Sequence, residues 1–89
     1  MPDEPVSAVD QLDARGLLCP LPVRLAARRA RRLEPGTRLE VLGTDPALPL
    51  DFEAWCHDEG HRIVERSRDG DTIRLVVLLG GAGDPEAPP

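Results

Sequence analysis

Two prolines, Pro20 and Pro22, stand immediately before an alanine- and arginine-rich run that continues to Leu33, and they fix where a helix can begin. Proline lacks an amide hydrogen and its ring holds φ near the helical value, so it is tolerated in a first helical turn and harmful further in. The pattern therefore predicts a helix with Pro20 at its first position and Pro22 at its third. The Glu34-Pro35-Gly36 segment would end it.

Cys19 then falls at the N-cap of this helix, where its sulfur would face free amides and the positive end of the helix dipole. Such surroundings lower the pKa of a cysteine from about 8.5. Arg15 and Arg24 lie close in sequence and would add to the effect, whereas the two prolines remove donors, so we expect a moderate lowering. The alternative is that Cys19 only fills space before a proline. Because Ser, Thr, Asp and Asn are the usual caps, we favour a reactive thiol.

The predicted first helix has two different faces. At 100° per residue, its buried arc contains Val23, Ala26, Ala27, Ala30 and Leu33. The opposite arc contains five arginines and two leucines: Arg24, Arg28, Arg29, Arg31, Arg32, Leu21 and Leu25. This arc is either a solvated basic face or a docking surface with apolar spots beside the thiol. The candidate docking residues are Arg15, Leu21, Arg24, Leu25 and Arg28.

The rest of the chain predicts three more strands and a second helix. A first strand is expected over 8–13, and further strands over 37–42, 61–68 and 72–79, the last two joined by an Asp69-Gly70 hairpin. The second helix follows Pro46 and ends at Glu59, before Gly60. With two helices to cover four strands, we expect a two-layer α/β sandwich of order β-α-β-α-β-β, with a four-stranded mixed sheet and both helices on one face.

The second helix carries the large apolar side chains. Leu48, Phe52, Trp55 and Cys56 share one of its faces. We interpret Phe52 and Trp55 as core residues in preference to a ligand-stacking pair. Cys56 is interpreted as an inert core residue in preference to a resolving thiol.

Length and charge exclude several classes of protein. The 89 residues allow one domain, predicted over 8–79, with polar, proline-containing ends over 1–7 and 80–89 expected to be disordered. The net charge of −5 argues against general nucleic-acid binding. No apolar run reaches the roughly 20 residues of a membrane span. Two cysteines without a signal peptide favour a reducing cytoplasm.

Other side chains give weaker signals. Cys56, His57 and His61 are of types that bind zinc, but their spacing supports no metal site and no fourth ligand is evident. Whether His61 approaches the thiol stays open. Asp13, Asp45 and Asp51 have loop or cap roles available and show no paired-carboxylate pattern. No cofactor-binding fingerprint is present, so every chemical indication leads to Cys19.

The segment Leu12-Asp13-Ala14-Arg15-Gly16-Leu17-Leu18-Cys19-Pro20-Leu21-Pro22 resembles the N-terminal signature of the TusA/SirA-like sulfur-carrier family. In that family an Asp, a Gly and a Cys-Pro-x-Pro box recur at this spacing. Glu34-Pro35-Gly36 and Thr44-Asp45-Pro46 fall where the family has a Pro-Gly turn and an Asp-Pro loop. The likeness covers about Leu12 to Leu79. It implies the same two-layer sandwich, with Pro20, Pro22, Asp13 and Gly16 shaping the site.

The resemblance also implies a sulfurtransferase function without a cofactor or metal. Cys19 would accept a sulfane sulfur as a persulfide from a donor such as a cysteine desulfurase or a rhodanese. An acceptor protein would receive it, in tRNA thiolation, molybdenum cofactor assembly or sulfur oxidation. Leu21 departs from relatives with a charged residue at the variable position of the box, and Cys56 resembles a second cysteine of some members. The alternative is a non-enzymatic regulatory module that docks through its arginine-rich helix, with Cys19 as a redox sensor.

Overall fold

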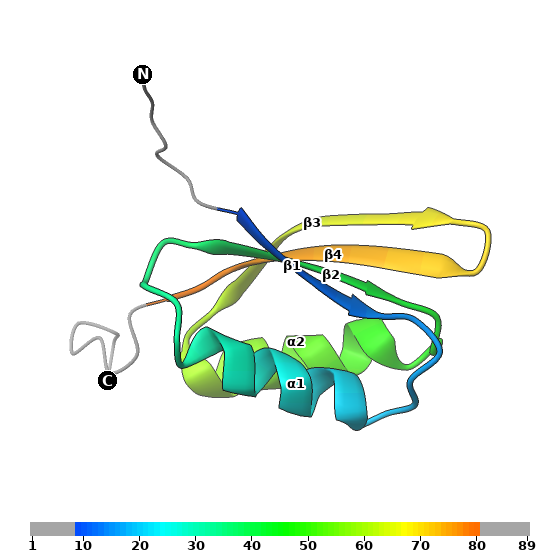
Figure 1. Cartoon of the computed structure of the whole chain (residues 1–89), viewed down its shortest axis with the longest axis horizontal. Helices are drawn as coiled ribbons and strands as arrows, with labels where there is room; N and C mark the ends of the chain where they lie inside the picture. The colour runs from blue at the N-terminus through cyan, green and yellow to red at the C-terminus, as the bar shows by residue number, and fades with distance from the viewer. Residues whose placement is uncertain (1–8, 81–89) are drawn as a thin grey trace, which may run out of the picture.

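The computed structural model describes residues 9–80. Six elements follow one another: β1 (Val9–Ala14), α1 (Leu21–Ala30), β2 (Arg38–Gly43), α2 (Leu48–Glu59), β3 (Arg62–Asp69) and β4 (Thr72–Leu78). The strand order in the sheet is β1-β2-β4-β3. β1 pairs with β2 in parallel, and the other two pairs are antiparallel. Both helices lie on one face of this mixed sheet (Figure 1), which confirms the predicted two-layer sandwich.

The predicted disordered ends, 1–7 and 80–89, lie outside the described residues except for Gly80. Gly80 is part of the fold, because its amide donates a 2.9 Å hydrogen bond to Nδ1 of His61. No helix in the described range 9–80 is long and apolar enough to cross a membrane.

The start of α1 differs from the prediction by one residue. Its N-cap is Pro20, with no side-chain cap, and its first residue is Leu21. Cys19 therefore precedes the cap. The regular helix also ends early, at Ala30, and the chain continues in tighter turns closed by the hydrogen bond from the amide of Leu33 to the carbonyl of Ala30. Such i to i−3 bonds are common at a helix end, and here Pro35 prevents the helix from continuing.

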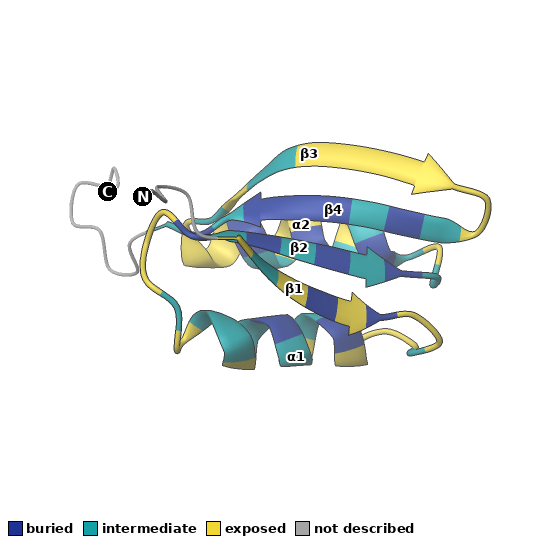
Figure 2. Ribbon diagram, turned by 45° about the horizontal axis from the view of Figure 1, so that its top comes forward, coloured by how far each residue is buried: buried dark blue, intermediate teal, exposed yellow. Residues whose placement is uncertain are grey.

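The core lies between the sheet and the two helices. Figure 2 shows the buried residues on β2, β4 and the inner sides of the helices. The fully buried large side chains are Phe52, Leu39, Leu48, Leu75, Val41, Val77 and Pro22. The predicted apolar face of α2 is confirmed, since Phe52 and Trp55 pack edge to face with ring centroids 5.7 Å apart. Cys56 is 4% exposed and belongs to the same core, as predicted.

Two residues of the predicted outer arc of α1 are drawn inward. Leu25 is half-buried and packs against the core. Arg29 donates to Oδ2 of Asp10 at 2.8 Å and to the carbonyl of Gln11 at 2.9 Å, so it joins α1 to β1. The basic face of α1 is therefore narrower than the helical wheel indicates. Its exposed members are Arg24 and Arg28, and two further exposed arginines, Arg31 and Arg32, follow directly after the helix.

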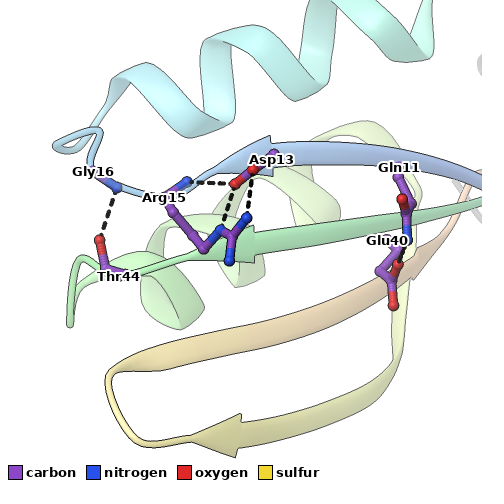
Figure 3. A network of polar contacts seen from close by, with 6 residues as sticks. All are labelled: Gln11, Asp13, Arg15, Gly16, Glu40 and Thr44. Atoms are coloured by element: carbon purple, nitrogen blue, oxygen red, sulfur yellow. Dashed lines mark hydrogen bonds and ion pairs between the residues drawn. The ribbon is translucent and has the colours of Figure 1, made fainter.

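The face of the sheet away from the helices carries a polar network that crosses all four strands. Gln11 on β1 donates to Glu40 on β2, as Figure 3 shows. Arg74 on β4 donates to Glu40 and to Oε1 of Glu65 on β3, the latter at 3.0 Å. Because this network pairs its charged groups with one another, this face is compatible with exposure to water.

Candidate functional site in the Cys19 loop

Cys19 is exposed in the loop that joins β1 to α1. The loop reverses at Gly16, whose φ of 83° lies in the left-handed region that glycine adopts most readily. The amide of Gly16 donates to Oγ1 of Thr44 at 2.9 Å (Figure 3). The amide of Leu17 donates to the carbonyl of Ala14 at 3.1 Å, and the Leu17 side chain packs against the core. These contacts give the loop a defined path.

Asp45 fixes the backbone of Cys19. Its Oδ2 accepts the Cys19 amide at 2.7 Å, and its Oδ1 accepts the Ala47 amide at 2.9 Å. These hydrogen bonds, first that from Ala47 and then that from Cys19, lower the pKa of the Asp45 carboxyl. One carboxylate therefore joins the loop that carries the thiol to the loop before α2.

Asp51 contacts the sulfur itself. It lies in the first turn of α2, and the thiol of Cys19 donates a hydrogen bond to its Oδ2. This bond, with desolvation and the negative charges of Asp51 and Asp45, raises the pKa of Cys19 to about 11. The prediction of a lowered pKa is therefore wrong. The sulfur lies before the cap of α1 and faces two carboxylates, which favour the neutral thiol.

Arg15 does not offset these charges, contrary to our expectation. Its side chain makes two hydrogen bonds to Asp13, from Nε to Oδ1 and from Nη2 to Oδ2, both at 2.8 Å (Figure 3). This pairing lowers the pKa of Asp13 to about 2. Asp13 therefore fixes the backbone at the end of β1 and pairs with the positive charge of Arg15. Within residues 9–80, Asp13 makes its hydrogen bonds and its ion pair with Arg15 and none with Cys19.

The other predicted site residues fall into two groups. Pro22 is buried and fixes the start of α1, while Leu21, Arg24 and Arg28 are exposed. Two more leucines, which are not among the predicted docking residues, are exposed next in sequence to residues of the site: Leu18 at 73% and Leu50 at 70%, against 42% for Leu21. Leu18 precedes Cys19, Leu21 follows it by two residues, and Leu50 precedes Asp51. We call Leu18, Leu21 and Leu50 the apolar rim.

His61 is not part of this site. Its ring lies against Trp55, with centroids 4.6 Å apart, and both line a pocket of about 440 Å³ with residues from the C-terminal end of α1, including Ala30 and Arg31. Cys19 precedes the opposite end of α1. In the described range, no group of three or more His, Cys, Asp or Glu side chains could hold a metal ion.

Asp45 and Asp51 are the functional candidates that the sequence did not identify as a pair. The family resemblance marked the Asp-Pro loop at Asp45 and gave no indication that its carboxylate reaches Cys19. Asp51 sits in a first helical turn, where an acidic residue is expected for its favourable interaction with the helix dipole. Because this role already explains Asp51, there was no reason in the sequence to expect its contact with the thiol, which lies 32 positions away in the chain.

The fold and the site together define a class: a small α/β domain that presents one accessible thiol on a loop held by hydrogen bonds. The family comparison agrees with this description. The model of the TusA sulfurtransferase family matches residues 10–78, which is nearly the whole described range. The chain belongs to the TusA family.

Individual relatives carry names of the same kind. A protein of Neisseria meningitidis serogroup B, named "Putative sulfur carrier protein NMB0681", is 40% identical over 68 residues, covering 76% of this chain and 92% of the relative. "Putative sulfur carrier protein YrkI" of Bacillus subtilis is 36% identical over 69 residues, covering 78% and 92%. YrkF of the same organism, similarly named, is 36% identical over 70 residues, which are 38% of its length. The family and these names support a sulfur-carrier role.

Proposed function

We propose that this protein accepts a sulfane sulfur on Cys19 as a persulfide and passes it to an acceptor protein. The observation that supports this most directly is the contrast between the two free cysteines. Cys19 is exposed on a loop held in place by Asp45, whereas Cys56 is buried in the core. A protein-to-protein relay requires a thiol that a partner's sulfur can reach, and Cys19 meets that requirement.

The proposed transfer is a thiol exchange without net oxidation. The Cys19 sulfur attacks the terminal sulfur of the donor's persulfide, so a new sulfur–sulfur bond forms on Cys19. The donor's own sulfur–sulfur bond breaks, and its electron pair stays on the donor's inner sulfur, which takes up the proton that Cys19 gives up. One thiol and one persulfide are consumed, and one of each is produced. The second transfer repeats this exchange with Cys19 as the donor.

The basic face of α1 supports a docking role beside the thiol. Arg24 and Arg28 are exposed, and neither forms an ion pair within residues 9–80. Free cations at the edge of an interface accelerate the encounter with an acidic partner. We propose that a cysteine desulfurase or a rhodanese docks here. The acceptor would belong to tRNA thiolation, molybdenum cofactor assembly or sulfur oxidation in the cytoplasm, where thiols stay reduced.

Labelled cysteine tests this proposal. The protein is incubated with a cysteine desulfurase and cysteine carrying radioactive sulfur, then separated on a gel without reductant. We expect label on the wild type that a thiol reductant removes, and none on Cys19→Ser. Equal reductant-sensitive label on both proteins would contradict the assignment to Cys19.

A further inference from the structure

We propose that Asp51 holds Cys19 as a neutral, hydrogen-bonded thiol in the free protein, and that a sulfur donor releases this thiol by pairing a basic side chain of its own with Asp51. The inference rests on the proposed sulfur-carrier function and adds a chemical requirement for the donor. The donor must bring a positive charge to the thiol as well as a sulfur.

The sulfur of Cys19 lies in negatively charged surroundings. The charged groups that act on Cys19 are two carboxylates, Asp51 on α2 and Asp45 in the preceding loop. The carboxylate oxygens of Asp45 accept hydrogen bonds from two backbone amides, so the position of this carboxylate is fixed. Within residues 9–80 neither carboxylate forms an ion pair, and Arg15 is held by Asp13. The chain's described residues therefore supply no cation to this acidic centre.

These negative charges make Cys19 less reactive in the free protein. The thiolate is the nucleophile in sulfur exchange, and an adjacent carboxylate disfavours it. In the free protein the thiol proton is held between Sγ of Cys19 and Oδ2 of Asp51. This arrangement protects an exposed cysteine from unselective oxidation and alkylation, because both reactions follow the thiolate.

A basic side chain of the donor can reverse the effect of Asp51 on the thiol. An arginine or lysine placed against Asp51 would offset the carboxylate charge and take over its hydrogen bond, so that the Cys19 proton can leave. The thiolate then attacks the donor's terminal sulfur, and the proton is taken up by the donor's departing inner sulfur. The apolar rim of Leu18, Leu21 and Leu50 would exclude water from this contact, which strengthens the pairing of opposite charges.

The test measures two rates on Asp51→Asn, and the proposal predicts opposite changes. The first is alkylation of the free protein by iodoacetamide, a small neutral reagent. If Asp51→Asn removed the whole shift, the pKa of Cys19 would fall from about 11 to the unshifted 9.0, and the thiolate fraction at mildly alkaline pH would rise by about two orders of magnitude. Desolvation and the charge of Asp45 remain in the variant, and nucleophilicity falls as the pKa falls, so we expect alkylation to be faster by a factor of several, with about tenfold as the upper limit.

The second rate is sulfur loading from a cysteine desulfurase. Asp51→Asn removes the partner of the donor's basic side chain, so we expect slower loading although the free thiol reacts faster. A purely structural role for Asp51 would not predict this divergence. Unchanged or slower alkylation would overturn the role of Asp51 in holding the thiol, and unchanged or faster loading would overturn the pairing with the donor's cation.

Glu53→Gln is the matched control, because Glu53 lies on α2 and its removal changes the net charge equally. Glu53 pairs with Arg66 at 2.7 Å, so both rates should match the wild type. Cys19→Ser measures the alkylation that occurs at groups other than Cys19. Circular dichroism verifies that each variant is folded. If the wild type itself fails to load, the proposed function fails, whereas the alkylation result still decides the role of Asp51.

Charged thiol reagents test the requirement for a cation without any donor. Aminoethyl methanethiosulfonate is positively charged and sulfonatoethyl methanethiosulfonate is negatively charged, and both form a disulfide with the thiol. We expect the wild type to react faster with the cationic reagent than with the anionic one. In Asp51→Asn the ratio of these two rates should be about fivefold smaller, as expected for the loss of one charge near the reacting atom. An equal preference in both proteins would overturn the proposal.

Discussion

The backbone amide of Cys19 and the carboxylate of Asp45 are joined by a 2.7 Å hydrogen bond across 26 positions of the chain. The sheet explains how they meet. β1 and β2 are parallel neighbours, with Ala14 opposite Gly43, so the loops that follow them leave the same edge of the sheet. The carboxyl ends of parallel strands are common places for binding sites for this reason. The thiol therefore has a defined position before any partner arrives.

Asp45→Ala should release the loop that carries the thiol. The variant loses the acceptor of the Cys19 and Ala47 amides, so we expect faster hydrogen exchange at the Cys19 amide and slower sulfur loading, by about tenfold, because a misplaced nucleophile loses rate steeply. Amide exchange and loading from a cysteine desulfurase measure the two effects.

Asp58→Ala is the control for this variant. Asp58 is an exposed acidic residue of α2, so its substitution removes one negative charge, as Asp45→Ala does, without changing the Cys19 loop. Normal loading by Asp45→Ala would contradict the positioning role of Asp45.

The helices and strands could be predicted from the sequence, whereas the electrostatic surroundings of the thiol could not. The six elements follow from local patterns, such as the alternation of Leu39 and Val41 with polar residues on β2, and the Asp69-Gly70 turn between β3 and β4. The position of Cys19 as the exposed thiol also followed from local pattern and resemblance. Its electrostatic environment did not, because Asp45 and Asp51 reach it from a distant part of the chain. The nearby charge in the sequence indicated that Arg15 would act on the thiol, but Arg15 forms an ion pair with Asp13.

A similar limit applies to α1. The wheel places Leu25 among the arginines, yet its side chain is long enough to reach the core beside Ala26, a small residue that allows close packing. A periodic pattern predicts which side of a helix faces inward, but the width of that side depends on the neighbouring elements.

Stability should fall in mild acid because of His61. Burial lowers the pKa of His61, with a smaller opposing effect of Glu59, so the folded state favours the neutral ring. The resulting stability is fully present above the ordinary value of 6.5 and is lost as the pH falls through the lower folded pKa. Protonation of Nδ1 would also remove the acceptor of the Gly80 amide.

Urea unfolding followed by the fluorescence of Trp55, the single tryptophan, measures this loss as a function of pH. His61→Asn should flatten the pH dependence, whereas His57→Asn, at an exposed position of α2, should leave it unchanged. A pH dependence that persists in His61→Asn and disappears in His57→Asn would contradict the assignment.

Gly16→Ala should weaken both the fold and the transfer. An added Cβ would meet nothing within 4 Å, so the cost comes from the backbone, whose φ is 83°. Placing a residue with a Cβ in this conformation costs roughly 1–2 kcal/mol. Any relaxation of the turn would shift the amide that binds Thr44 and, with it, the Cys19 loop, so we expect slower loading as well.

Gly70→Ala is a matched comparison for this variant, since Gly70 also has positive φ, 62°, and no atom near the added Cβ. It lies in the β3–β4 hairpin, so it should destabilise the fold similarly and leave the loading rate of the folded protein unchanged. Equal loading by the two variants would contradict a site-shaping role for Gly16.

Reversing two charges on α1 tests the docking face. Arg24→Glu with Arg28→Glu should lower the kcat/KM of sulfur loading by about tenfold at low salt, chiefly through a slower encounter, and salt should reduce the difference. The control is Arg62→Glu with Arg68→Glu, which makes the same charge change at exposed positions of β3. Equal losses in the two double variants would indicate a general charge effect and contradict docking at α1.

The most direct test of the account is the intact mass of the reduced protein before and after incubation with a cysteine desulfurase and cysteine. Wild type and Cys56→Ala should each gain the mass of one sulfur atom, which a thiol reductant removes, and Cys19→Ser should gain none. A reductant-sensitive gain that persists in Cys19→Ser and disappears in Cys56→Ala would contradict the central claim that Cys19 carries the sulfur.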